Sequence, residues 1–135
     1  MYISKKNREI IKMKFGGKCA YSGTELEPNW QCDHMESIAV NNWLVYKGCS
    51  DEKDINSANN LMPSQKIINH YKRGFGLEGF RKYMKDFHIR LSKLPKNPYV
   101  IKSIKRKAYM LEIARLFDIT ITKPFSGKFY FETLN

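Results

Sequence analysis

Acidic residues are scarce in this sequence of 135 residues, in which 13 Asp and Glu stand against 24 Lys and Arg. The imbalance is local, because residues 61–107 hold thirteen basic and two acidic residues while the rest of the chain is balanced. Such a block is the electrostatic footprint of a polyanion partner, since each phosphate that Lys or Arg neutralises releases counterions. Charge alone also allows a solvated helical face, and it says nothing about chemistry.

Cysteine is also scarce, and long apolar runs are missing. Cys19, Cys32 and Cys49 are an odd number without the spacing of a disulfide framework, so we expect free thiols in a reducing compartment. The sequence contains no run of about eighteen apolar residues, and its start leads into the charged residues Lys5 and Lys6 without an apolar segment, so we expect neither a membrane span nor a secretory signal. These features predict a cytoplasmic protein.

The length, and the lack of linker-like Gly/Ser or Pro tracts, predict one globular domain over residues 1–135. Ser4 is expected to cap a helix that continues to about Phe15, where Gly16-Gly17 end it by supplying positive φ. Residues 30–35 then alternate in the period-two manner of a strand.

The middle of the chain reads as a long loop followed by a helix. The polar stretch of residues 40–60 is typical of a loop, and long loops in compact domains are often functional. Pro63 suits the first turn of a helix that runs to about Lys72, because proline lacks the amide that this turn leaves unpaired.

In the last part of the chain the sequence predicts two further helices and a hairpin. Apolar residues recur at helical spacing from Leu77 to Leu94, where Pro95 breaks the pattern. Asn97-Pro98 is expected to open the next helix, which reaches about Phe117. Its predicted apolar face comprises Val100, Ile104, Leu111, Ala114 and Leu116. Residues 119–133 resemble a β-hairpin, and the whole is an α+β fold in which helices dominate.

Three short motifs carry residues that are capable of chemistry. Asp33-His34 ends the predicted strand, Asn60-Leu61-Met62-Pro63 precedes the predicted helix, and Asn69-x-x-Lys72 lies inside it. Taken singly each motif is weak, because a surface histidine or a capping asparagine explains it equally well. Only the order and spacing of the three motifs together point to a functional site.

Together these motifs resemble the HNH (ββα-metal) nuclease family. The resemblance extends from about residue 8 to residue 81. It rests on four segments, which are Phe15 to Gly23, Gln31-Cys32-Asp33-His34, Asn60-Leu61-Met62-Pro63-Ser64 and Asn69-His70-Tyr71-Lys72. It implies a ββα-metal core of the HNH or His-Me finger type. To that core the chain adds an N-terminal helix, and an extension of about residues 82–135 with two helices and a terminal β-hairpin.

The resemblance implies roles for four residues. His34 matches the general base that activates water, and Asp33 matches a metal ligand. Asn60 matches the asparagine that keeps the histidine oriented, and Asn69 matches the second protein ligand of the metal. An alternative register makes His70 that ligand, although only one of two successive helix residues faces the metal.

The implied chemistry is hydrolysis of a DNA phosphodiester bond, by nicking or by cutting. A carboxylate and an amide oxygen suit a hard cation, so we expect Mg²⁺ or Mn²⁺. His34 is mostly neutral at pH 7 and can take the proton of the attacking water, which leaves a 5′ phosphate on the product. RNA stays an alternative substrate, because chemistry on the backbone reads little sequence.

The chain departs from family members that carry a structural zinc on two C-x-x-C pairs. At the corresponding positions it has Cys19, Ser22, Gln65 and Ile68. One cysteine of four cannot build a tetrahedral zinc site, so we expect no structural zinc.

Basic residues are expected to hold nucleic acid by its phosphates, in double- or single-stranded DNA. The predicted contacts are Lys66, Lys72, Arg73, Arg81, Lys82, Lys85, Lys102, Lys105, Arg106 and Lys107. A second hypothesis keeps this basic surface on a protein that binds nucleic acid, or acts as an inhibitor, without catalysis. The two hypotheses differ in metal-dependent cleavage that is lost with His34→Ala.

Overall fold

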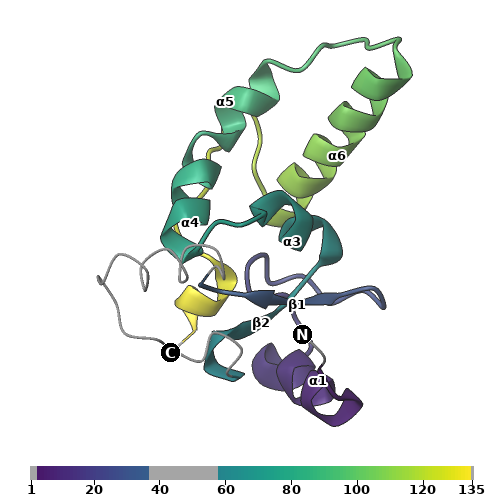
Figure 1. Cartoon of the computed structure of the whole chain (residues 1–135). Coiled ribbons are helices and arrows are strands. Elements are labelled where there is room, and N and C mark those ends of the chain that lie inside the picture. The colour runs from purple at the N-terminus through teal and green to yellow at the C-terminus, as the bar shows by residue number, and fades with distance from the viewer. Residues whose placement is uncertain (1–2, 37–57, 135) are drawn as a thin grey trace, which may run out of the picture. The chain divides into compact units, whose positions relative to one another are not determined.

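The computed structural model describes residues 3–36 and 58–134. Within these ranges the chain forms helices and one antiparallel sheet of two strands (Figure 1). In chain order the elements are α1 (Lys5–Lys12), β1 (Gln31–His34), β2 (Leu61–Ser64), α3 (Lys66–Lys72), α4 (Leu77–Lys85), α5 (Phe87–Ser92) and α6 (Ile101–Phe117). The predicted α+β class is therefore confirmed. Most of the predicted loop, residues 37–57, lies outside the described residues.

The chain divides into two compact units. Unit 1 consists of two segments, one that ends at Phe80 and one that begins at Phe129. Unit 2 is Arg81–Lys128. The boundary inside α4 lies close to residue 81, where the predicted motif core ends. Unit 1 nevertheless also contains the last residues, which the sequence assigned to the extension.

The first helix is confirmed as predicted. The Ser4 hydroxyl accepts a hydrogen bond from the amide of Asn7, which satisfies one of the amides that a helix start leaves unpaired. A 3-10 helix, Met13–Phe15, continues α1, and Gly16 ends it in the left-handed region at φ 66°. Ile11 is buried, whereas Ile10 is exposed.

The sheet corrects the prediction for Pro63, which lies in β2 and not in a helix. β1 pairs with β2 so that Cys32 faces Pro63 and His34 faces Leu61. The Pro63 carbonyl accepts the amide of Ala20 at 2.8 Å, on the side away from β1. A residue in a strand points its N–H and C=O to the same side, so proline at this position removes no hydrogen bond to β1.

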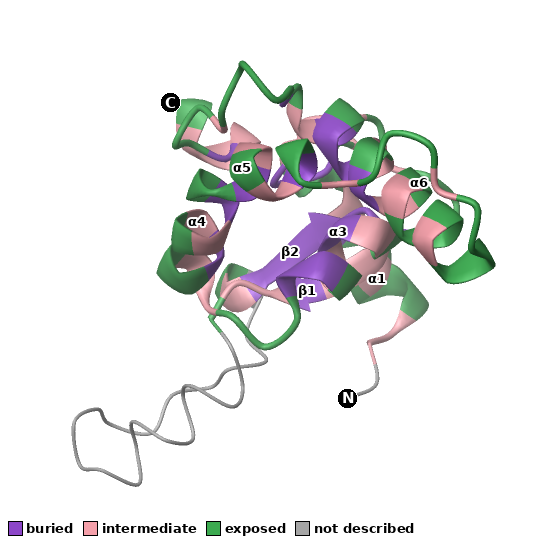
Figure 2. Cartoon of the chain, turned by 90° about the horizontal axis from the view of Figure 1, so that it is seen from above, coloured by how far each residue is buried: buried purple, intermediate pink, exposed green. Residues whose placement is uncertain are grey.

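An apolar cluster covers one face of this sheet. Ile11, Trp30 and Leu61 form this cluster, with Cys32 packed against it. Because successive strand residues point to opposite faces, Asp33 points to the other face. Figure 2 shows most of β2 as buried. Leu61, Met62, Pro63 and Ser64 are all buried, so β2 is the centre of unit 1.

An aromatic cluster of unit 1 holds the C-terminal segment. The ring centroid of Phe129 lies 5.3 Å from that of Tyr21 and 5.2 Å from that of Phe80. The amides of Tyr130 and Phe131 donate to the carbonyls of Tyr21 and Ala20 at 3.0 and 2.9 Å. The C-terminal residues are therefore part of the core of unit 1.

The predicted terminal hairpin is wrong. Thr120 pairs with Lys123 in an isolated bridge, and Tyr130–Thr133 is a 3-10 helix. The side chain of Glu132 accepts the amide of Phe129 at 2.9 Å, so this short helix is capped by its own glutamate. Because the following amides bond to the 20–21 segment, no second strand is needed to satisfy them.

The single amphipathic helix predicted to Leu94 is two helices, α4 and α5, with Asp86 between them. Its apolar face is nevertheless correct, since Phe80, Met84, Phe87 and Leu91 are all buried. At the break the guanidinium of Arg90 donates to the carbonyl of Tyr83 at 2.8 Å, which satisfies an acceptor near the end of α4. Its carbon Cζ also lies 3.9 Å from the centre of the Tyr83 ring.

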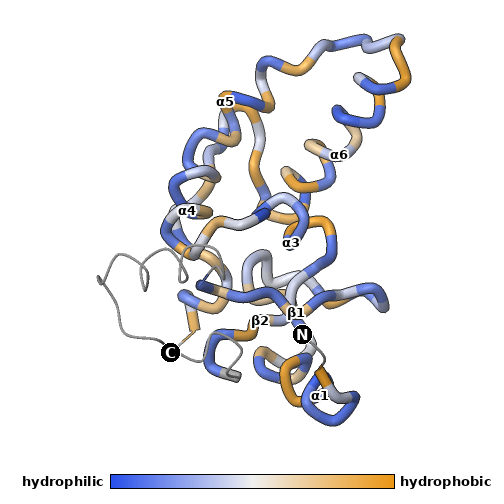
Figure 3. The backbone as a smooth tube through the Cα atoms, in the orientation of Figure 1, coloured by the Kyte–Doolittle hydropathy of each residue, from blue (hydrophilic) through white to orange (hydrophobic). Residues whose placement is uncertain are grey.

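The last helix also differs from its prediction. α6 begins at Ile101 behind Val100, so Asn97-Pro98 precedes the helix and does not open it. Its buried residues are Met110, Ile113, Ala114 and Leu116, whereas Val100, Ile104 and Leu111 are exposed. The C-terminal half of α6 therefore supplies the packing, and hydrophobic residues alternate with hydrophilic ones along the other half (Figure 3).

A substitution at Gly23 tests whether the C-terminal segment packs against the turn that contains this glycine. Gly17 and Gly23 both have positive φ, 83° and 74°, but only at Gly23 would an added Cβ meet a neighbour, Tyr130 Cδ1 at 2.5 Å. We expect Gly17→Ala to lower the free energy of unfolding by about 1–2 kcal/mol through backbone strain. Gly23→Ala should cost a further 1–3 kcal/mol or so, because the Tyr130 ring must move. Urea unfolding of both variants measures the difference, and equal losses would contradict the observed docking.

Candidate active site

β1 and α3 carry three of the predicted residues, Asp33, Asn69 and Lys72. Gln31 and Asp33 are two apart on β1 and so share the face that is turned toward α3. From α3, the side-chain amide of Asn69 donates to Gln31 Oε1 at 2.7 Å. Also from α3, Lys72 Nζ lies 3.2 Å from Asp33 Oδ2. One strand face and one helix face thus form a single polar cluster.

Lys72 is the centre of this cluster and is only 1% exposed. Its ammonium donates to the carbonyl of His34 at 2.9 Å and to that of Phe75 at 2.7 Å, in addition to its ion pair with Asp33. The prediction that Lys72 contacts phosphate is therefore corrected, because a buried ammonium with three acceptors cannot reach nucleic acid. Lys72 instead ties β1 to the C-terminal turn of α3.

Asp33 is a buried carboxylate that is held by one of its two oxygens. Oδ2 accepts a hydrogen bond from the hydroxyl of Tyr21 as well as the contact from Lys72. Burial raises the pKa of Asp33, while Lys72, Tyr21 and His34 act to lower it. Burial together with Asp33 raises the pKa of Tyr21 well above its usual value, so its hydroxyl keeps its proton and remains a donor.

His34 is the last residue of β1 and is half-buried. Because its pairing with Leu61 continues the strand, its side chain leaves the backbone on the face opposite to Asp33. The imidazole still lies close enough to Asp33 to lower the pKa of that carboxyl electrostatically. Lys72 links the two residues through the carboxylate of one and the carbonyl of the other.

Asn60 fixes the chain that follows His34. Its side-chain oxygen accepts the amide of Glu36 at 2.8 Å, and its side-chain nitrogen donates to the carbonyl of Glu36 at 3.3 Å. Its own carbonyl accepts the amide of Met35 at 2.8 Å. These three hydrogen bonds hold the backbone at the exit of β1 and so restrict where His34 can point.

The donor atoms at this cluster fit a hard divalent cation. Tyr21 and Lys72 both contact Oδ2 of Asp33, so Oδ1 is the oxygen through which this carboxylate would bind a cation. Asn69 uses its amide nitrogen on Gln31, which turns its amide oxygen away from that residue. Carboxylate and amide oxygens are the ligands that Mg²⁺ takes, alongside several waters.

Two further observations bear on a metal. Among residues 3–36 and 58–134 no group of three or more His, Cys, Asp or Glu side chains is placed to hold an ion. A pair made of Asp33 and Asn69 does not need such a group, because Mg²⁺ keeps most of its ligands as water. His70, the alternative ligand, is exposed.

Gln65 directly precedes α3 and is one of the four residues that stand at the expected zinc positions. It is buried, and its side-chain nitrogen donates to Thr24 Oγ1 at 3.0 Å and to the carbonyl of Glu25 at 2.7 Å. Its side-chain oxygen accepts the amide of Glu27 at 3.2 Å. These three hydrogen bonds join the start of α3 to the 24–27 turn. Buried Cys19 and Ile68 complete this region by packing.

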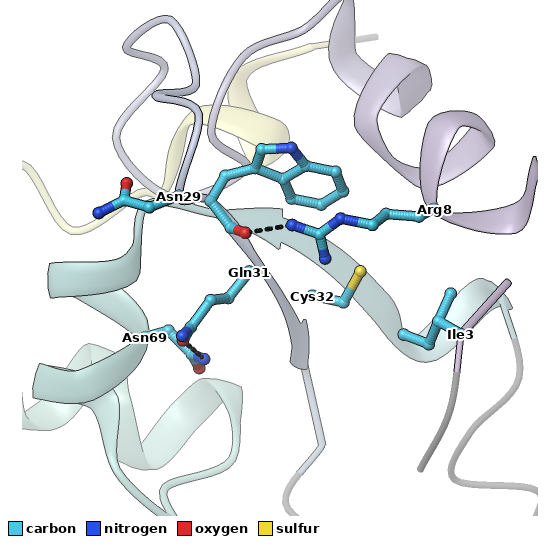
Figure 4. Close-up of a pocket in the computed structure, with 7 residues that line it drawn as sticks. Ile3, Arg8, Asn29, Gln31, Cys32 and Asn69 are labelled. Carbon is cyan, nitrogen blue, oxygen red and sulfur yellow. Dashed lines mark hydrogen bonds between the residues drawn. The ribbon is translucent and has the colours of Figure 1, made fainter. Parts of the chain in front are cut away.

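A surface pocket of about 500 Å³ opens along β1 (Figure 4). Residues from α1, β1 and α3 line it, and Asn69 with its partner Gln31 forms one wall. The guanidinium of Arg8 stacks 4.0 Å from the centre of the Trp30 ring and donates to the Trp30 carbonyl at 2.5 Å. Burial raises the pKa of the Cys32 thiol, which therefore stays protonated and is no nucleophile.

The remaining predicted nucleic-acid contacts divide between the two units. Lys66 and Arg73 are exposed in unit 1, and the others belong to unit 2. Arg81 donates to the carbonyl of Gly127, and Lys107 donates to the carbonyls of Pro95 and Lys96. Arg81 and Lys107 therefore also hold loops of unit 2 in place.

Comparison of the chain with protein-family models, curated proteins and solved structures gives no match. Within the described ranges, no helix is long and apolar enough to cross a membrane. The cytoplasmic location stays a prediction.

Three contributors to the site were missed by the sequence analysis. Gln31 had a usable signal, because it lies two residues before Asp33 and must share its strand face. Tyr21 and Gln65 had none, since their contacts cross 12 and about 40 residues of chain. Only the folded arrangement of the turns reveals them.

The buried ion pair gives a stability prediction. Lys72→Met leaves the Asp33 carboxylate buried without its cation, so we expect the free energy of unfolding to fall by about 3–5 kcal/mol. Lys66→Met, on the exposed side of the same helix, is the matched control and should change it by less than about 0.5 kcal/mol. The double variant Asp33→Asn/Lys72→Met should regain much of the loss. Equal effects of the two single lysine variants in urea unfolding would contradict the assignment.

Proposed function

We propose that this chain is a metal-dependent endonuclease of the HNH (ββα-metal) type that hydrolyses phosphodiester bonds in DNA. The observation that carries the proposal is the polar cluster between β1 and α3. In it Lys72 contacts Asp33 and the backbone of His34, and Asn69 on the same helix contacts Gln31 of β1. The order of strand, strand and helix supports the ββα core that the motifs resemble.

In this proposal Asp33 Oδ1 and the side-chain oxygen of Asn69 hold the cation. Tyr21 and Lys72 orient the carboxylate by holding Oδ2, as outer residues orient the ligands in metal sites. The bound cation would supply Lewis-acid stabilisation of the charge that develops on the phosphate and the leaving oxygen. Lys72 contributes a second, fixed positive charge that keeps the buried carboxylate ionised.

His34 is the general base of the proposed reaction. It takes a proton from a water that attacks phosphorus, and the bond from phosphorus to the 3′ oxygen breaks. The 3′ oxygen acquires a proton from solvent, so the products carry a 3′ hydroxyl and a 5′ phosphate. Asn60 acts as a positioning residue through its three bonds to the chain after His34.

The central experiment incubates the full chain with supercoiled plasmid and Mg²⁺, Mn²⁺ or EDTA. We expect nicked or linear DNA with either metal, none with EDTA, and a loss of about 10²–10⁴-fold in rate for His34→Ala, the usual contribution of a general base. His70→Ala is the matched control, because it removes an exposed histidine next to Asn69, and it should cleave normally. The nicks should reseal with DNA ligase without prior phosphorylation.

Other results would redirect the assignment. Loss of cleavage in His70→Ala, with activity kept in Asn69→Ala, would make His70 the ligand. Faster cleavage of an RNA of the same sequence would change the substrate. No cleavage with any metal, despite binding that weakens with salt, would favour the second candidate.

The second candidate function is nucleic-acid binding, or inhibition, without catalysis. The burial of Asp33, 5% exposed, and the engagement of its Oδ2 by Lys72 and Tyr21 favour it. A carboxylate that is already neutralised by a lysine needs no metal for stability. We place this candidate second, because the three hydrogen bonds of Asn60 at the exit of β1 have no evident purpose in a protein that only binds.

A further inference from the structure

The N-terminal half of α6 has no buried side. None of the residues 101–109 is buried, and burial in this helix begins at Met110. Tyr99, Val100 and Ile101 are three successive large side chains that are 90%, 52% and 70% exposed, which is unusual for apolar residues. Helices gain most of their stability from packing an apolar face, so this half of α6 is expected to pack on another molecule.

The charge of unit 2 identifies that molecule as an anion. Unit 2 holds thirteen basic and three acidic residues, and residues 87–111 contain no Asp or Glu. Two of the three acidic residues already form ion pairs within the unit, Glu112 with Arg115 and Asp118 with Lys123. The cations at the start of α6 therefore have no acidic residue near them in sequence.

Apolar and basic residues occupy neighbouring faces of this half-helix. Lys102, Lys105 and Arg106 follow the three- and four-residue spacing of one face, and all three are exposed. A second exposed face comprises Ile101, Ile104, Ala108 and Leu111. It contains no aromatic residue, unlike the apolar faces of helices that lie in a membrane surface.

The two faces match what a helix meets in the major groove of DNA. The groove is about 12 Å wide and admits an α-helix, whose exposed side makes the contacts. Basic residues reach the phosphates that border the groove, and apolar side chains contact the methyl groups of thymine. Lys107 bonds to the carbonyls of Pro95 and Lys96, which holds the preceding loop against α6 and leaves the helix start accessible.

We infer that residues 101–109 of α6 enter the major groove of duplex DNA. Lys102, Lys105 and Arg106 bind its phosphates, while Ile101 and Ile104 face the edges of the bases. This inference rests on the proposed function for the choice of DNA as the polyanion. It goes beyond that proposal by naming the helix, the groove and the contacts that position the substrate.

The test measures DNA binding without cleavage. The full chain carrying His34→Ala is titrated in EDTA with a fluorescent thymine-rich duplex, and the affinity is followed by anisotropy from low to high salt. Lys102→Gln/Lys105→Gln/Arg106→Gln should reduce the slope of log affinity against log salt by about 2.7, or 0.9 for each lost phosphate contact. Lys5→Gln/Lys6→Gln/Lys12→Gln on α1 is the matched control and should keep the slope.

The apolar face needs a second pair of variants. Ile101→Ala/Ile104→Ala should weaken binding by roughly tenfold with the slope unchanged, because it removes buried apolar area and no charge. Replacing thymine by uracil in the duplex should weaken binding of the parent protein but have little further effect on this variant. The side chains replaced on α6 are all exposed, so circular dichroism should show unchanged folding of these variants.

Three outcomes would overturn the inference. An unchanged slope in the charge variant would remove α6 from the interface. A reduced slope with no effect of the apolar variant or of uracil would leave phosphate contact without entry into the groove. Binding to vesicles of anionic lipid, without binding to DNA, would make a membrane surface the partner. Because no turnover is needed, a chain that binds in this way but never cleaves would contradict the nuclease proposal alone.

Discussion

The contact between Lys72 and Asp33 is the interaction on which the rest of unit 1 depends. It places an ammonium and a carboxylate inside the protein, where neither is tolerated without the other. Because Lys72 also donates to the carbonyls of His34 and Phe75, it fixes the distance between β1 and the end of α3. Tyr21 brings the aromatic core to the same carboxylate. One buried cation thus links the Asp33 carboxylate to the backbone of His34.

The fold was predictable from the sequence where a signal was local. Ser4 marked the first helix and the alternation around Gln31 marked β1, because capping and strand periodicity act over a few residues. The prediction of secondary structure failed where tertiary contacts determine the local conformation. Pro63 looked like a helix start but lies in a strand, since its missing amide faces away from β1. The Phe129 segment looked like a strand but packs as a short helix on Tyr21.

The motifs that make up the candidate site were visible in the sequence, but the contacts between their residues were not. The spacing of Asp33, Asn60 and Asn69 singled out three segments of the chain. Two of them, β1 and α3, are in contact in the structure. Lys72 was predicted to contact phosphate, like the other basic residues of its stretch. Its burial depends on a carboxylate 39 positions earlier in the chain, a distance over which a sequence pattern carries no information.

The most direct measurement of the central claim is the broadening of backbone amide signals by Mn²⁺ in the inactive His34→Ala protein, without nucleic acid. The account predicts that signals of Asp33 and Asn69 disappear first, that those of α6 persist, and that Asp33→Asn abolishes the effect. Broadening that is centred elsewhere, or that is uniform along the chain, would contradict a metal site between β1 and α3.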